Sequence, residues 1–209
     1  EALGCTNSTA LNYNPEATEE DNTCVFIFQP QTKDELETAL IPESYDDGFH
    51  TLSSTYGEIN TWDTSLITDM SYLIYKAYYF NHDISDWDVS NVTNMERMFR
   101  SAYAFNQDIS DWDVSSVTNM DYMFYYAESF NQDISDWDVS SVIYMYNMFD
   151  YTDDLSDDNR CAIHTTFSSN DNWPYDWSDL CAPFQPETRD ELKTAVDEWI
   201  EDPERAELT

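Results

Sequence analysis

Residues 80–104 read FNHDISDWDVSNVTNMERMFRSAYA, and this stretch decides the fold because it returns twice with little change. Residues 105–129 read FNQDISDWDVSSVTNMDYMFYYAES, and residues 130–154 read FNQDISDWDVSSVIYMYNMFDYTDD. A diverged first copy begins near Thr55. Four copies at a period of 25 residues predict a repeat architecture, in which each unit buries its apolar side against the next.

Within one copy, the apolar spacing changes from the first half to the second. The first half has leucine-rich-repeat spacing and predicts a short strand across the Trp-x-Val segment. The second half, from Val92 to Ala102, has i, i+3, i+4 spacing and predicts a short helix, with Ser90 or Asn91 as its N-cap. We therefore predict an α/β fold, a short leucine-rich-repeat-like solenoid of about four 25-residue strand-helix repeats between disulfide-stapled end modules. The core columns include Trp62, Trp87, Trp112 and Trp137, and Met70, Met95, Met120 and Met145.

The segments that flank the repeats divide the chain further. Residues 28–39 (FQPQTKDELETA) return as residues 184–195 (FQPETRDELKTA), each with a threonine ahead of an amphipathic helix. Two interpretations of this duplication are open: the protein is a tandem array, or the tail caps the first repeat of a neighbouring molecule. The predicted segments are a Cys-bounded module (1–27), a linker helix and N-terminal cap (28–54), the repeat solenoid (55–154), a C-terminal disulfide cap with a helix near Asp157–Thr166 (155–183), and a second linker helix (184–209).

Four cysteines form two local pairs, one at each end of the repeat block. Because the block separates the pairs, we expect the disulfides Cys5–Cys24 and Cys161–Cys181. Zinc binding is the alternative, but it needs close Cys/His spacing, and no C-x-x-C occurs. Disulfides predict an oxidising, extracellular or cell-surface location. The N-glycosylation sequons at Asn7 and Asn91 agree with export.

The composition excludes several classes of function. The chain has 43 acidic and 8 basic residues, for a net charge of −35, which excludes a nucleic-acid binder and disfavours anionic membrane surfaces. The longest apolar run, Val25–Phe28, is far too short to insert into a membrane. The chain opens without an initiator methionine or an apolar leader, so we expect a processed protein or a fragment. The three histidines are scattered and no nucleophile or zinc-protease motif occurs, so we expect no enzyme and no organic cofactor.

The unit FNQDISDWDVSSVTNM, followed by M-F-x-x-A, resembles the repeat of the BspA-like leucine-rich-repeat surface proteins. The resemblance covers about residues 55–151, and residues 155–177 are similar to the terminal cap of such proteins. The segment from Gly4 to Cys24 resembles a small Cys-bounded module that is similar to thrombospondin type 3 calcium repeats. These resemblances imply secretion, surface display and adhesion or protein binding, without catalysis.

Acidic columns flank the tryptophan column and form a candidate calcium site. Neighbouring strands lie about 4.8 Å apart, and carboxylates at that spacing repel by roughly 1 kcal/mol even in water. Calcium, which prefers carboxylate oxygens, would neutralise such a ladder and would also suit the module between Cys5 and Cys24. Alternatively, the aspartates hydrogen-bond turn amides or are screened by salt. The candidate ligands are Asp86, Asp88, Asp111, Asp113, Asp136 and Asp138.

Tyrosines on the exposed side of the predicted helices form a candidate interface, because exposed aromatic residues are enriched at protein interfaces. The alternative is that they lean onto neighbouring helices. We predict a structural or adhesive repeat protein, a subunit or segment of a surface filament that assembles head to tail with copies of itself. The alternative is a monomeric receptor or adhesin module that binds an extracellular protein or glycan through its Asp-lined face. The interface candidates are Tyr72, Tyr75, Tyr122, Tyr125 and Tyr126.

Overall fold

The computed structural model of the chain describes residues 2–8, 10, 13–24, 26–40, 56–181, 188, 189 and 193. The part of the predicted linker from 41 to 54, and most of the predicted helix at 184–209, therefore lie outside the described residues. In chain order the elements are β1 (Leu3–Gly4), β2 (Glu19–Glu20), α1 (Lys33–Leu40), the 3-10 helix η2 (Ile59–Thr61), α2 (Asp157–Phe167) and the 3-10 helix η3 (Ser178–Cys181). β1 and β2 pair in parallel within the N-terminal module.

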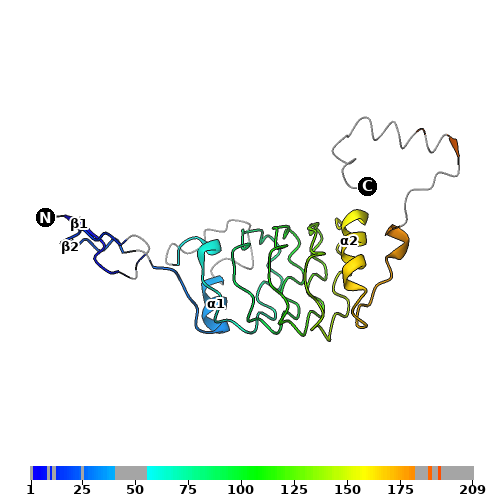
Figure 1. The fold of residues 1–209 in the computed structure, drawn as a ribbon, viewed down its shortest axis with the longest axis horizontal. Coiled ribbons are helices and arrows are strands. Elements are labelled where there is room, and N and C mark those ends of the chain that lie inside the picture. Colours follow the sequence, from blue (N-terminus) through cyan, green and yellow to red (C-terminus); the bar gives the residue numbers. More distant parts are fainter. Residues whose placement is uncertain are drawn as a thin grey trace.

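The predicted α/β solenoid of strand-helix repeats is wrong. Both strands of the described chain lie in the N-terminal module, and α1 and α2 lie on either side of the repeats. From residue 62 to residue 154 the described chain consists of turns and irregular backbone. Neighbouring copies are joined by isolated parallel bridges instead of strands, at Asp69, Asn94, Asn119 and Tyr144. Each copy is therefore a turn-rich coil, and the coils stack between α1 and α2 (Figure 1).

Consecutive β-turns occupy the segment where we predicted a helix. The N–H of Met98 donates to the carbonyl of Met95 (3.2 Å), and the N–H of Ala102 to that of Phe99 (3.0 Å). The third residues of these turns are Arg97 and Ser101, whose φ values are 56° and 61°. A positive φ at that position defines a type II turn and interrupts an α-helix. Equivalent positions share this conformation: Tyr72, Lys76, Tyr122, Tyr126, Asn147 and Tyr151.

Aspartate side chains disrupt the predicted strand in the first half of each copy. Asp88 Oδ1 accepts hydrogen bonds from the N–H and the hydroxyl of Ser90, at 3.0 and 2.6 Å. The N–H of Trp87 donates to the carbonyl of Ile84 (3.1 Å), which closes another turn. Such local bonds compete with extended strand pairing, so the backbone bends around the tryptophan.

Hydrogen bonds between coils replace the missing sheet. The N–H groups of Arg97, Phe99 and Ser101 donate to carbonyls of the next coil at 2.9, 3.0 and 2.8 Å. The tryptophan side chains bond in the opposite direction, to the preceding coil. Their Nε1 atoms reach the carbonyls of Ile59, Ile84 and Ile109 at 2.8, 3.3 and 3.1 Å, from Trp87, Trp112 and Trp137 respectively.

The apolar columns fill the interior of the stack, as their repetition predicts. Phe99 and Phe124 stack with ring centroids 5.5 Å apart, and Trp112 and Trp137 stack at 6.4 Å. All seven methionines are at most 1% exposed. Burying this apolar surface is the main favourable term in folding.

The helix α1 covers the first coil. Leu36 and Ala39 are buried in the common core. The Nζ of Lys33 donates to the carbonyl of Ser71 and, at 2.9 Å, to its hydroxyl. The carbonyl of Phe28 accepts from the N–H of Asp63 at 2.9 Å. Residues 28–40 are therefore an N-terminal cap of the repeat block.

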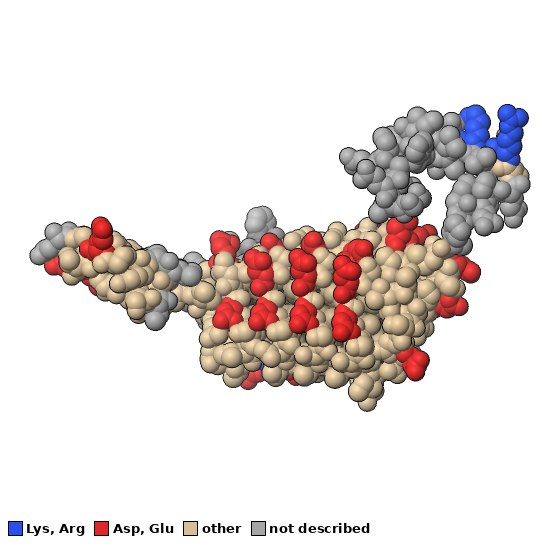
Figure 2. Space-filling model, viewed as in Figure 1, with Lys and Arg blue, Asp and Glu red and all other residues tan. Residues whose placement is uncertain are grey.

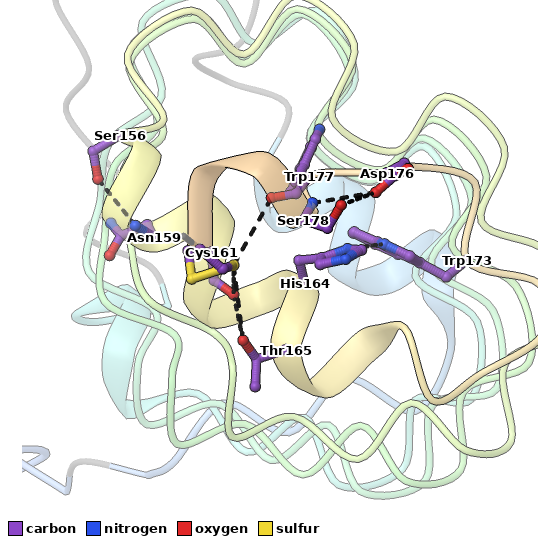
Figure 3. The surroundings of a disulfide bond; sticks show 10 residues. Ser156, Asn159, Cys161, His164, Thr165, Trp173, Asp176, Trp177 and Ser178 are labelled. Carbon is purple, nitrogen blue, oxygen red and sulfur yellow. Dashed lines mark hydrogen bonds between the residues drawn. A yellow bond between two sulfur atoms is a disulfide. The ribbon is translucent and has the colours of Figure 1, made fainter. Parts of the chain in front are cut away.

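The helix α2 closes the other end of the stack. It spans Asp157–Phe167, one residue longer than the helix predicted near Asp157–Thr166. Ser156 lies one repeat period after Asn131, and its N–H donates to Asn131 Oδ1 (2.9 Å). Its hydroxyl caps α2 by accepting from the N–H of Asn159 (3.2 Å). The disulfide Cys161–Cys181 joins α2 to η3 (Figure 3). This cap continues the register of the repeats and ends the stack.

Candidate functional site

The cysteines are paired in the way that the local spacing favours. Disulfides join Cys5 to Cys24 and Cys161 to Cys181. Among the described residues, one group offers three metal-ligand atoms within 4.8 Å of one another: Cys5, Glu20 and Cys24. Two of these three groups form the disulfide and are not available as thiolate ligands, which speaks against zinc there.

Glu20 instead helps to hold the N-terminal module together. Its carboxylate accepts hydrogen bonds from the N–H and the hydroxyl of Thr6, at 2.9 and 3.0 Å. The bond from the Thr6 N–H is the largest cause that lowers the pKa of Glu20, so this carboxylate is ionised. Calcium binding within this module stays a prediction.

Figure 2 shows acidic side chains in parallel rows that run across the coils. Most of these aspartates lie in Asp-x-Ser turns. Asp113 Oδ1 accepts from the N–H of Ser115 (3.1 Å) and from its hydroxyl (2.6 Å), and Asp108 binds Ser110 in the same way at 3.0 and 2.7 Å. The same backbone bond recurs at Asp63, Asp83, Asp88, Asp133 and Asp138.

Hydrogen bonds from the serines lower the pKa of four of these aspartates, Asp83, Asp108, Asp113 and Asp138. The Ser115 hydroxyl and N–H lower the pKa of Asp113, and this outweighs the opposing effect of the Asp138 charge in the next coil. The Ser85 N–H and hydroxyl lower the pKa of Asp83 in the same way. Hydrogen bonds thus offset the repulsion between neighbouring carboxylates locally. This agrees with the alternative in which the aspartates accept hydrogen bonds from turn amides.

The predicted calcium ligands form two distinct groups. In the first group, Asp88, Asp113 and Asp138, each Oδ1 accepts a hydrogen bond from the N–H of the serine two residues later. Asp86, Asp111 and Asp136 are exposed, and Asp86 Oδ2 accepts from Asn60 Nδ2 at 2.9 Å. In the described part of the chain, no three of these carboxylates bring oxygens within 4.8 Å of one another. Calcium on the rows stays a prediction.

Both sequon asparagines lie at the surface. Asn91 is exposed, and its amide nitrogen donates to the carbonyl of Ser65 at 2.9 Å. Asn7 is exposed in the N-terminal module. Whether either side chain carries a glycan stays a prediction.

The predicted interface tyrosines gather on one surface of the stack, in two groups of touching rings. Tyr72 contacts Tyr75 at a centroid distance of 5.6 Å, and Tyr122 contacts Tyr125 at 5.4 Å. Tyr125 also contacts Tyr126 at 4.8 Å. We call this surface, together with Arg97, Arg100 and Tyr151, the tyrosine face.

Two arginines that our sequence analysis missed lie between these groups. The guanidinium of Arg97 is 5.2 Å from the Tyr72 ring and 4.9 Å from the Tyr122 ring. That of Arg100 is 5.8 Å from Tyr75 and 5.0 Å from Tyr125. The signal was present in the sequence, because positions 72, 97 and 122 read Tyr-Arg-Tyr, and so do positions 75, 100 and 125. Tyrosine and arginine are the residue types enriched at binding hot spots.

The two arginines differ in their charge environment. Arg97 pairs with Glu96 at 2.5 Å, whereas Arg100 has no ion pair among the described residues. Burial raises the pKa of Tyr125, and the neighbouring Tyr126 and Tyr151 raise it further, so this phenol stays protonated. The tyrosine face therefore presents the protonated Tyr125 ring and, at Arg100, a positive charge without an ion pair among the described residues, on a strongly acidic molecule.

The comparisons with known proteins give one family. The family model described as "Mycoplasma protein of unknown function, DUF285" matches residues 43–160, more than half of the chain. No curated protein and no solved structure matches the chain significantly. Among the described residues, neither α1 nor α2 has the length and apolar character that crossing a bilayer requires.

Proposed function

The chain belongs to the family described as Mycoplasma protein of unknown function, DUF285, and on that premise we propose that it is an extracellular structural repeat protein. In this proposal the molecule is a unit of a cell-surface appendage or filament, joined head to tail with further units. In this proposal it catalyses no reaction.

The two disulfides support the extracellular part of the proposal. Cys5–Cys24 and Cys161–Cys181 are the kind of bond that persists in oxidising compartments. The exposed sequon at Asn91 is compatible with the same location.

The duplicated cap is the observation that carries the head-to-tail part. On the first coil, the cap buries Leu36 and Ala39, and Gln29 Nε2 donates to Asp63 Oδ2 at 2.6 Å. Lys33 lies 3.6 Å from Asp69 and also binds Ser71. The tail keeps every residue type that makes these contacts, with a single Lys-to-Arg change: Phe184, Gln185, Pro186, Arg189, Leu192 and Ala195.

A segment with these residues has the chemistry to cover the first coil of another repeat block. Every copy of the chain has residues 28–40 in that position. In this proposal the tail of one molecule therefore displaces residues 28–40 of the next molecule from its first coil, an exchange of identical elements between subunits. A contact between unlike ends generates an open chain of units when the rotation from one unit to the next does not close a ring.

Sedimentation velocity on the full chain tests this proposal. We expect oligomers whose size grows with concentration, and we expect Leu192→Asp or deletion of residues 184–209 to reduce them to monomer. Leu66→Asp is the matched control, since Leu66 is 48% exposed on the first coil and should leave assembly unchanged. A monomer at every concentration for the unmodified chain contradicts the head-to-tail proposal.

The alternative function is a monomeric receptor or adhesin module that binds a protein or glycan. The exposed rows that include Asp111 and Asp113 favour it, because a regular negative surface steers a cationic partner. This alternative predicts a monomer whose partner binding falls with Asp111→Ala and Asp113→Ala.

A further inference from the structure

The oxidisable side chains of the repeats differ in their exposure to solvent. All seven methionines are at most 1% exposed, and the four cysteines are in disulfides. The tryptophans of the repeats, Trp62, Trp87, Trp112 and Trp137, are at most 4% exposed. Tyrosines, by contrast, crowd the surface. On the surface of the repeats, a one-electron oxidant from solvent therefore meets phenol rings before it meets methionine, cysteine or tryptophan side chains.

Two pairs of surface tyrosines lie parallel in neighbouring coils. The rings of Tyr126 and Tyr151 have centroids 4.3 Å apart and planes 4° from parallel. Those of Tyr78 and Tyr103 are 5.0 Å apart and 15° from parallel. In each pair the residues hold equivalent positions of adjacent copies, 25 residues apart, and their ring faces are in contact.

We propose that Tyr126 and Tyr151 form a site of oxidative tyrosine coupling, which joins two neighbouring coils by a carbon–carbon bond. Tyr78 and Tyr103 form a second, more widely spaced site of the same kind. The oxidant is a peroxidase acting with hydrogen peroxide. This inference goes beyond the structural role, and it draws on an extracellular location only for the supply of oxidant.

The chemistry balances with that oxidant. Each phenol loses one electron and one proton, which leaves two phenoxyl radicals. The ring carbons ortho to the two oxygens then form a bond, and the hydrogen on each of these carbons moves to its phenol oxygen as a proton, which restores both aromatic rings. Together the tyrosines lose two hydrogen atoms, and hydrogen peroxide is reduced to two molecules of water.

Ring geometry makes the coupling selective. The stacked pair is held in contact before oxidation, and such preorganisation greatly favours reaction within one molecule over reaction between molecules. Tyr125 packs edge-on against both rings, with centroids 4.8 Å from Tyr126 and 5.4 Å from Tyr151. The bond would fix the coil that precedes α2, close to the end already held by Cys161–Cys181.

A third pair provides a control within the same molecule. Tyr122 and Tyr146 join the same two coils, but their rings meet edge to face at 78° with centroids 5.6 Å apart. Tyr146 is 60% exposed and Tyr151 is 52% exposed, so access to oxidant is similar. A difference in yield between the pairs therefore reports on ring geometry.

The experiment treats the folded, disulfide-intact chain with peroxidase and hydrogen peroxide, isolates the monomer, and maps cross-linked peptides by mass spectrometry. We expect a Tyr126–Tyr151 peptide pair two hydrogens lighter than its parts, with a yield about tenfold above that of Tyr122–Tyr146. Tyr151→Phe and Tyr126→Phe should each abolish this product, and Tyr146→Phe should leave it. Unchanged urea midpoints show that the variants fold.

Three results would overturn the proposal. They are the absence of any coupled product in the monomer, an equal yield at Tyr122–Tyr146, and coupling confined to links between molecules.

Discussion

Ser101→Gly tests the turn conformation that replaces the predicted helix. Ser101 has a φ of 61°, and its N–H donates to the carbonyl of Tyr125 in the next coil at 2.8 Å. In a helix, glycine at this position would destabilise the protein by about 1 kcal/mol. In a type II turn, glycine adopts the positive φ without steric cost. The two conformations therefore predict effects of opposite sign.

The magnitude follows from two opposing terms. Holding an L-residue in the left-handed region costs about 1–2 kcal/mol. Glycine also lowers the free energy of unfolding by about 0.5–1 kcal/mol, because the unfolded chain has more conformational freedom at glycine. We expect Ser101→Gly to raise the free energy of unfolding by about 0.5–1 kcal/mol. For a chain of this length, that corresponds to an increase in Tm of about 1–4 °C.

Urea unfolding followed by tryptophan fluorescence measures the change. Ser116→Gly is the matched control, because Ser116 is an exposed turn residue whose φ is not positive. Ser116→Gly should lower the free energy of unfolding by about 0.5–1 kcal/mol, because glycine raises the conformational entropy of the unfolded chain. If Ser101→Gly destabilises the protein as much as Ser116→Gly does, residue 101 does not hold the left-handed conformation and the account of the turns fails.

Three further predictions concern the acidic rows and the two ends of the stack. Ser115→Ala should raise the pKa of Asp113, whose largest lowering comes from the Ser115 hydroxyl. Because the folded pKa lies below the unfolded one, the stabilisation is present above about pH 4 and is lost as the pH falls through the folded pKa. The Tm deficit of this variant at neutral pH should therefore vanish in strong acid, and a deficit that persists there contradicts the assignment. Replacing both cysteines of the Cys161–Cys181 pair by serine opens a bond with a sequence separation of 20 and should cost about 3 kcal/mol in urea unfolding. No change would mean that the C-terminal cap needs no disulfide. Leu36→Ala should cost about 2–5 kcal/mol, because Leu36 is fully buried on the side of α1 that packs against the repeats. A loss below 1 kcal/mol would show that α1 does not cap the first coil.

Much of the interior was predictable from the repeat period. Residues that recur every 25 positions with one apolar type, such as Trp87 and Trp112, lie in the core because stacked copies place equivalent residues on top of one another. The cysteine pairing was predictable for a related reason, since a long repeat block separates the two local pairs.

The candidate surfaces were only partly predictable. The columns placed the aspartates and tyrosines on the outside, but not the partners that decide their chemistry. The bond from Ser115 to Asp113 depends on how the backbone turns between them. The place of Arg97 between two rings depends on the way three successive coils superpose.

The sequence by itself determined the period, the columns of the core, the negative charge and the two disulfide pairs, because each follows from residue type and position along the chain. The tertiary structure decided the backbone between the columns. The M-x-x-M-F-x-x-A spacing fits a helical face and a series of four-residue turns equally well. Arg97 and Ser101 adopt positive φ values, and their N–H groups bond to the next coil. Those bonds join residues that are distant in the sequence, so local preferences could not reveal the turns.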